Sequence, residues 1–171
     1  MSRAGYSDDG DDPLAMGRWR AQIRSATRGK RGQQFFRDLI AALDALPEKE
    51  LIAGELKTDE GCVCALGALG TARGVDLSEL DTEDYERLGA TFDIASQLAR
   101  ETMYENDEYV DSFKYVEVQI CGPVTPYWPD YGRTTKEIRV PDLEERKKRW
   151  KHVRAWAESN LCKPSKAEGM Q

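Results

Sequence analysis

The segment Arg28–Gln33, which reads Arg-Gly-Lys-Arg-Gly-Gln, is the most informative polar feature of this sequence. Its two glycines permit a turn with exposed backbone N–H groups, and its three cations lie beside them. A helix is expected to begin directly afterwards, so its positive dipole end would add to these charges. The pattern favours binding of a phosphate or another anion, and the candidate contacts are Arg24, Arg28, Lys30, Arg31 and Gln33. The alternative is an ordinary interhelical loop whose arginines pair with acidic residues of the same chain.

A second candidate surface is aromatic. Tyr127, Trp128 and Tyr131 lie in a segment rich in proline and glycine, where the tip of a β hairpin is expected. Exposed aromatic side chains supply rigid contact area for a protein partner. Two interpretations stay open, namely a partner contact and a return of the loop onto its own domain.

Few residues of this chain are suited to catalysis or to holding a metal ion. Cys62 and Cys64 are separated by a single residue, whereas structural zinc sites have longer gaps between paired cysteines, so they are expected to be small buried residues. His152 is the only histidine and is expected to be a solvated helical residue. The motifs of P-loop proteins, zinc proteases and serine hydrolases do not occur. We therefore predict no catalytic residue, no metal and no cofactor. An enzyme stays open as a third hypothesis, which a cleft of converging carboxylates or a bound metal would favour.

The charges of the 171-residue chain are segregated, and its net charge is −6. Positions 17 to 37 hold seven basic residues and no acidic one, whereas positions 76 to 111 hold twelve acidic residues. The net charge argues against simple attraction of the whole molecule to nucleic acid. The acidic segment allows the hypothesis that it imitates a nucleic-acid backbone in front of a basic channel of another protein. The alternative is that both segments are solvated faces.

Hydrophobic periodicity predicts which elements position these residues. Apolar residues at helical spacing predict helices from about residue 14 to 27 and from 33 to 45, and Pro47 closes the second. The apolar segment from Gly61 to Gly74 predicts a short buried helix, ended by Gly74 in a left-handed conformation. We expect this segment to be the centre of the fold.

The second half of the chain combines helical and strand patterns. One helix of about three turns, capped by Asp81 or Thr82, is expected to be marked by the helical spacing of Phe92, Ala95, Leu98, Ala99 and Thr102. Alternation at 115–120 and 136–140 predicts a hairpin. A last helix is expected to start at Pro141, with core positions at Leu143, Trp150, Val153 and Ala157.

These elements predict an α+β fold, a mainly helical single domain with a small β hairpin or sheet. The domain is expected to span residues 14–162 with the hairpin inserted at about 115–140, between disordered tails at 1–13 and 163–171. No apolar run approaches the roughly 18 residues of a membrane helix, and acidic residues stand where a signal peptide needs its apolar core. We expect a cytoplasmic protein with reduced cysteines and no membrane contact.

Several motifs together resemble one known group of proteins. They are Trp19-Arg20, the Arg28–Gln33 segment with Phe35 or Phe36, Ala41–Lys49, Cys64–Leu69, Arg73-Gly74, Phe92–Ala95, Tyr104–Glu108 and Arg149–Trp156. Over about residues 19 to 156 the sequence resembles a family of small uncharacterised proteins carried by bacteriophages and prophages of Gram-negative bacteria. The hairpin section, 115–140, is longer than the family pattern. The resemblance implies a phage origin and the bacterial host cytoplasm as the setting, and it brings no catalytic residues and no cofactor.

Two functional hypotheses follow. The first is a non-catalytic phage accessory protein that binds a bacterial or phage protein, in a role such as countering host defence, with Tyr127, Trp128 and Tyr131 among its contacts. The alternative is a nucleic-acid or nucleotide binder that uses the Arg28–Gln33 segment to hold phosphate.

Overall fold

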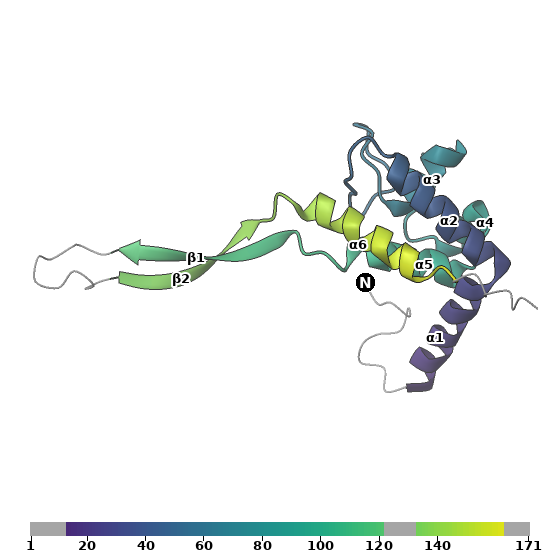
Figure 1. Cartoon of the computed structure of the whole chain (residues 1–171), viewed down its shortest axis with the longest axis horizontal. Helices are drawn as coiled ribbons and strands as arrows, with labels where there is room; N and C mark the ends of the chain where they lie inside the picture. The colour runs from purple at the N-terminus through teal and green to yellow at the C-terminus, as the bar shows by residue number, and fades with distance from the viewer. Residues whose placement is uncertain (1–12, 122–132, 163–171) are drawn as a thin grey trace, which may run out of the picture. The chain divides into compact units, whose positions relative to one another are not determined.

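The structure is a computed structural model that describes residues 13–121 and 133–162 (Figure 1). The described chain forms two compact units, a helical unit that ends at Val110 and resumes at Arg146, and a hairpin unit from Asp111 to Glu145. Apart from Pro13, the two expected tails lie outside the described residues. The mainly helical α+β class is confirmed, and the elements are α1 (Pro13–Arg28), α2 (Lys30–Ala45), α3 (Ala65–Arg73), α4 (Tyr85–Phe92), α5 (Ser96–Asp107), β1 (Phe113–Cys121), β2 (Arg133–Pro141) and α6 (Glu145–Ser159).

The corner between α1 and α2 is tighter than the sequence predicts. Gly29 alone separates the two helices, so α2 begins three residues before the expected start and the segment from Lys30 onward is helix rather than an open turn. Gly32 is buried in the first turn of α2, where a Cβ would lie 2.0 Å from the carbonyl oxygen of Ala26. Its missing side chain therefore lets α2 approach the end of α1, which removes the expected role of Gly32 in exposing backbone N–H groups.

The short helix α3 is the most buried part of the helical unit, since every residue from Ala65 to Gly70 is buried. The Sγ of Cys64 caps its start by accepting a hydrogen bond of 3.3 Å from the N–H of Gly67. A Cβ at Gly67 would lie 1.8 Å from the carbonyl oxygen of Leu56, so only glycine permits this approach. Gly74 ends the helix at φ 68, which confirms the predicted left-handed cap.

The predicted helix through residues 92 to 102 is interrupted. The chain leaves α4 at Asp93, which adopts a left-handed φ of 55, and α5 starts at Ser96. The cap of α4 is Asp84, whose side chain accepts from the N–H of Arg87, and not Asp81 or Thr82. Apolar spacing alone does not reveal the break, because Phe92 and Leu98 are buried on both sides of it.

A buried polar cluster joins four segments of the helical unit. Arg149 of α6 is 1% exposed and donates to the carbonyl oxygens of Asn106 and Leu51, at 2.9 and 3.1 Å. Asn106 donates to the carbonyl oxygen of Ile52 at 2.8 Å and accepts from the N–H of Ala65, the first residue of α3, at 3.0 Å. The cluster satisfies backbone groups that would otherwise be buried without partners.

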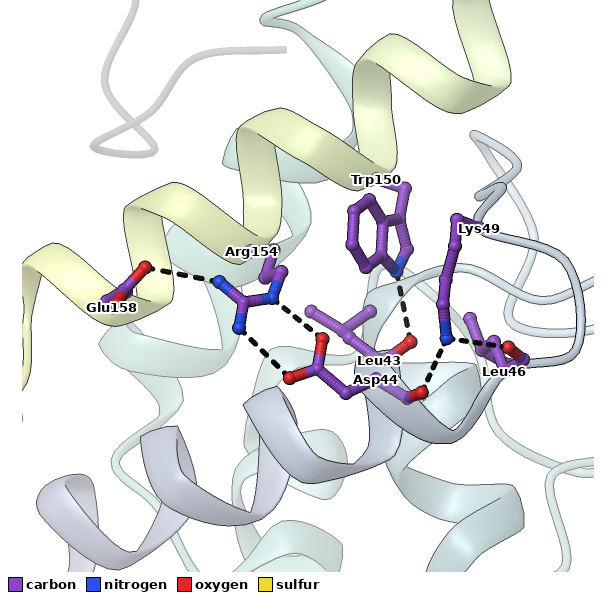
Figure 2. A network of polar contacts seen from close by, with 7 residues as sticks. All are labelled: Leu43, Asp44, Leu46, Lys49, Trp150, Arg154 and Glu158. Atoms are coloured by element: carbon purple, nitrogen blue, oxygen red, sulfur yellow. Dashed lines mark hydrogen bonds and ion pairs between the residues drawn. The ribbon is translucent and has the colours of Figure 1, made fainter.

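Helices α2 and α6 are joined by side chains at the C-terminal end of α2 (Figure 2). Arg154 binds both carboxylate oxygens of Asp44, at 2.7 and 3.0 Å, and reaches Glu158 at 3.1 Å. The indole N–H of Trp150 donates to the carbonyl oxygen of Leu43 at 3.0 Å. The bidentate pairing of Arg154 with Asp44 constrains the relative orientation of α2 and α6 as well as their separation.

The same network closes the C-terminal end of α2. The ammonium group of Lys49 donates to the carbonyl oxygens of Asp44 and Leu46 (Figure 2), which have no partner within the helix ladder. The hydrogen bond from Arg154 is the main cause that lowers the pKa of the Asp44 carboxyl below its usual range. The same bond raises the pKa of the Arg154 guanidinium.

In the hairpin unit, β1 and β2 pair as antiparallel strands with Val116 opposite Ile138 and Glu117 opposite Glu137. The predicted hairpin is confirmed, and each strand extends beyond the predicted ranges 115–120 and 136–140. Because side chains alternate along a strand, one face carries the aliphatic residues Val116, Val118, Ile120, Ile138 and Val140, and the other carries Phe113 and Tyr115.

The start of the last helix differs from the prediction. Pro141 is the final residue of β2, and α6 begins at Glu145. Leu143, expected in the core, is 92% exposed. A proline is favoured at the first helical position and also tolerated at the end of an edge strand, so the residue type did not distinguish the two.

Candidate functional site

Five basic side chains gather where the end of α1, the start of α2 and the ends of α3 and α4 meet, around a groove of about 600 Å³. We call this the cationic groove, and its basic residues are Arg28, Lys30, Arg31, Arg37 and Arg73. The first three were predicted as anion contacts. Arg73 comes from α3 and joins them only through the tertiary fold.

Two carboxylates partly neutralise the groove. Arg31 pairs with Asp93 at 3.2 Å, and both side chains are largely exposed. Arg73 pairs with Asp38 at 2.6 Å and also donates to the carbonyl oxygen of Phe92. The sequence-based alternative of internal pairing therefore holds for Arg31, because Asp93 belongs to the acidic middle segment.

The charges of the other three cations, Arg28, Lys30 and Arg37, are not neutralised by a carboxylate of the described chain. Within residues 13–121 and 133–162, no carboxylate pairs with Arg28, Lys30 or Arg37. Arg37 donates to the neutral side chain of Gln34 at 3.0 Å. All three cations are exposed, so an anionic group in the groove meets uncompensated positive charge.

The helix ends contribute less than the sequence suggests. Gly29 precedes α2 without a side-chain cap, which leaves the first N–H groups of α2 without such a partner. However, the N–H of Gly29 bonds to the carbonyl oxygen of Ser25 at 3.1 Å, so the negative end of α1 adjoins the positive end of α2. The two dipoles offset each other, and the side chains dominate the potential of the groove.

The side chain of Gln33 joins the end of α1 to the segment that follows α6. Its amide nitrogen donates to the carbonyl oxygens of Thr27 and Asn160, at 2.8 and 2.9 Å. Its amide oxygen accepts from the N–H of Cys162 at 2.7 Å. Both amide protons are used within the chain, so Gln33 connects the α1–α2 corner to the end of α6 and offers an external anion no donor.

Arg24 lies at a different cavity. This cavity, which we call the α1 pocket, has a volume of about 570 Å³ and is lined by α1, by Glu101 of α5 and by the end of α6. Arg20, Arg24 and Arg28 line it at four-residue intervals, and Arg28 also lines the cationic groove. The two cavities are therefore neighbours. The apolar residues of the α1 pocket are Met16, Trp19, Ile23 and Leu161.

Trp19 is the buried aromatic of the α1 pocket. It is 7% exposed, and its indole N–H is buried with no hydrogen-bond acceptor among the described residues. The guanidinium of Arg100 lies 5.8 Å from the centre of the indole ring. Because a buried donor without an acceptor is costly, this N–H is the least satisfied group of the pocket.

The two cysteines at Cys62 and Cys64 differ in environment. Cys64 is buried, which raises the pKa of its thiol to about 12 and keeps it protonated. Cys62 is half-buried, with the guanidinium of Arg146 at 3.8 Å from its sulfur. Among the residues that the structure describes, no three His, Cys, Asp or Glu side chains group in a way that could hold a metal ion.

His152 is not the solvated residue that the sequence predicts. Its Nε2 lies 2.7 Å from a carboxylate oxygen of the buried Glu105, and its ring stacks on Tyr109 with centres 3.8 Å apart. The three side chains come from α5, its C-terminal flank and α6, which only the tertiary fold brings together. Their positions alone point to a structural link between α5 and α6.

The predicted aromatic surface lies outside the described residues, and the prediction of the cationic groove omitted two of its basic residues, Arg37 and Arg73. Tyr127, Trp128 and Tyr131 lie outside the described residues. Arg37 was missed although a signal existed, because it follows Lys30 by seven residues, two turns of a helix that starts at Lys30. No local sequence pattern places Arg73 or Asp93 at the groove, because each belongs to a segment that reaches it only through tertiary packing.

Comparisons of this chain with protein-family models, with curated proteins and with solved structures return no match. The resemblance to phage proteins therefore stays a prediction. None of the helices within 13–121 and 133–162 combines the length and the apolar character needed to cross a membrane.

Proposed function

We propose that this protein is a binding protein whose cationic groove holds an acidic segment of another protein. The observation that carries the proposal is the set of three exposed cations, Arg28, Lys30 and Arg37, without carboxylate partners in the described chain. Like charges that share a concave surface repel one another, and an anionic ligand relieves that repulsion. Arginine also binds carboxylates through two parallel hydrogen bonds, as Arg154 does with Asp44.

Two features favour an acidic peptide over a nucleic acid. The carboxylates of Asp38 and Asp93 adjoin the groove, so a uniformly charged polyanion would meet repulsion beside each attractive contact. The net charge of −6 also repels a long polyanion, whereas a short acidic segment can align its carboxylates with the unpaired cations only. Nucleotide or nucleic-acid binding is the second candidate.

We further infer the biological setting from the sequence motifs alone. Their resemblance to phage and prophage proteins supports a partner from the bacterial host or the phage, in the host cytoplasm. A role in countering host defence is one form of this proposal.

The decisive experiment compares two charge-matched variants of the full chain. Arg28→Glu with Lys30→Glu reverses two groove cations, whereas Lys136→Glu with Lys151→Glu makes the same charge change at exposed positions that line neither cavity. Fluorescence anisotropy measures binding of a labelled twelve-residue peptide rich in aspartate, and of an oligonucleotide of equal charge. We expect the groove variant to lose roughly tenfold in peptide affinity and the control less than about twofold.

The outcomes separate the candidates. Equal losses in the two variants would mean that net charge alone attracts the peptide, and the groove proposal fails. Tighter binding of the oligonucleotide, lost in the groove variant, would favour the nucleic-acid candidate instead. No binding of either probe at low salt would exclude both.

A further inference from the structure

The α1 pocket adjoins the cationic groove and has a different chemistry. Arg20 and Arg24 line the α1 pocket but not the cationic groove, whereas Arg28 lines both cavities. Residues four apart on a helix are neighbours on its surface, so these three arginines form one row along α1. None of them has a carboxylate partner among the described residues.

Behind this row one part of the pocket wall is apolar, and the rest is polar, with Thr27, the buried Glu101, Ser159 and Asn160 in the lining. Met16 and Ile23 are half-buried on α1, and Leu161 closes the pocket from the end of α6. A volume of about 570 Å³ lies within the range of sites that hold small ligands and exceeds what one side chain fills. The apolar part of the wall, formed by Met16, Ile23 and Leu161 beside a row of arginines, is suited to an apolar group that is flanked by negative charge.

We propose that the α1 pocket receives a large apolar side chain of the acidic partner segment, so that the two cavities bind one peptide. This inference rests on the proposed function of the cationic groove, and it specifies the partner as an acidic segment with an apolar anchor. The carboxylates on one side of the anchor meet Arg20 and Arg24, and those on the other side continue past Arg28 into the groove.

The burial of Trp19 argues against a nucleotide in this pocket. Base recognition on an aromatic side chain needs an open ring face on which the base can stack. Trp19 is only 7% exposed, and the remaining apolar lining is aliphatic. Aliphatic walls bind an apolar side chain without such a geometric demand.

The test uses three labelled peptides of equal length. The anchored peptide carries leucine and phenylalanine at its centre between aspartates. The acid-only peptide has serines at those two positions, and the apolar-only peptide has asparagines in place of the aspartates. We expect the anchored peptide to bind the full chain roughly tenfold more tightly than either control, measured by fluorescence anisotropy.

A matched pair of variants locates the anchor. Ile23→Asn makes the pocket polar, whereas Ala21→Asn places the same side chain at an exposed position of α1 outside the pocket. We expect Ile23→Asn to reduce the affinity for the anchored peptide to that for the acid-only peptide, and Ala21→Asn to change neither. Thermal unfolding followed by circular dichroism establishes that both variants are folded.

A second variant keeps the test decisive if Ile23→Asn does not fold. Arg20→Gln with Arg24→Gln alters only exposed side chains that do not line the groove. We expect roughly a tenfold loss for the anchored peptide and less than about a twofold loss for the acid-only peptide.

The results distinguish this inference from the proposed function. Equal binding of the anchored and acid-only peptides, with loss of both in Arg28→Glu with Lys30→Glu, would overturn the anchor and leave the groove proposal standing. Absence of binding by all three peptides would overturn both. Binding of an oligonucleotide that is lost in Ile23→Asn would assign the pocket to a base and overturn the peptide assignment.

Discussion

The guanidinium of Arg149 donates a hydrogen bond of 2.9 Å to the carbonyl oxygen of Asn106 from within the core of the helical unit. Asn106 belongs to the last turn of α5, where carbonyl groups lack partners in the helix ladder and carry partial negative charge. Arg149 also donates to the carbonyl oxygen of Leu51 at 3.1 Å. The side chain of Arg149 thus supplies hydrogen-bond donors to backbone carbonyl groups of two segments that are distant in sequence.

Removing this cation is expected to destabilise the fold. Arg149→Met keeps an unbranched side chain but leaves two buried carbonyl groups without their donor, and we expect it to lower the free energy of unfolding by roughly 3 kcal/mol. Urea denaturation measures the change. Lys151→Met, at an exposed position of the same helix, is the control and is expected to stay within about 0.5 kcal/mol. Equal effects of the two substitutions would contradict the structural role of Arg149.

Two glycine-to-alanine substitutions are expected to act in opposite directions. At Gly67 the new Cβ would lie 1.8 Å from the carbonyl oxygen of Leu56, so Gly67→Ala should cost about 2 kcal/mol through overpacking. At Gly17, in α1, the new Cβ would meet nothing within 4 Å beyond its own stretch of helix in the described chain, and Gly17→Ala should gain about 0.5–1 kcal/mol from helix propensity. Thermal unfolding monitored by circular dichroism gives both values. A tolerated Gly67→Ala would show that α3 and the segment at Leu56 can separate without cost.

The pair between Asp44 and Arg154 predicts a pH-dependent contribution to stability. The folded Asp44 carboxyl has a lowered pKa, mainly through the hydrogen bond from Arg154, so protons bind it more weakly than in the unfolded chain. The stabilisation is therefore complete above the ordinary carboxyl range and is lost as the pH falls through the folded pKa. We expect wild type to exceed Asp44→Asn in stability at pH 7, and the difference to shrink below about pH 4.

Urea unfolding at a series of pH values measures this difference. Asp59→Asn, at an exposed position for which no hydrogen bond or ion pair is found in the described chain, is the control and should follow wild type throughout. A constant difference between Asp44→Asn and wild type from pH 7 to pH 3 would rule out the ion pair as its source.

Asp93 limits the positive charge of the cationic groove, so its neutralisation should strengthen ligand binding. Asp93→Asn removes the carboxylate that pairs with Arg31 and keeps a short polar side chain that tolerates the left-handed backbone. We expect the affinity for the anchored acidic peptide to rise roughly threefold. Glu86→Gln makes the same charge change on the exposed surface of α4, outside the groove, and should have a smaller effect. An equal rise in both variants would indicate net charge rather than groove charge.

Local patterns in the sequence predicted much of the secondary structure. The apolar stripe of α2, the small residues of α3 and the alternation of β1 and β2 each depend on neighbouring residues, and each predicted element is present, although α2 starts earlier and both strands are longer than predicted. Errors arose where one residue type suits two local structures. Asp93 interrupts a helical pattern without being glycine or proline, and Pro141 ends a strand where it was expected to start a helix.

By itself, the sequence determined that this chain forms a mainly helical α+β fold around the segment from Gly61 to Gly74, and that cations cluster near Arg28. Only the tertiary structure decided which cations share a surface. It brought Arg73 to the groove, gave Arg31 a partner in Asp93, and turned the amide of Gln33 toward the end of α6. The physical reason is that secondary structure depends on contacts within a few residues, whereas a site depends on the packing of helices distant in sequence.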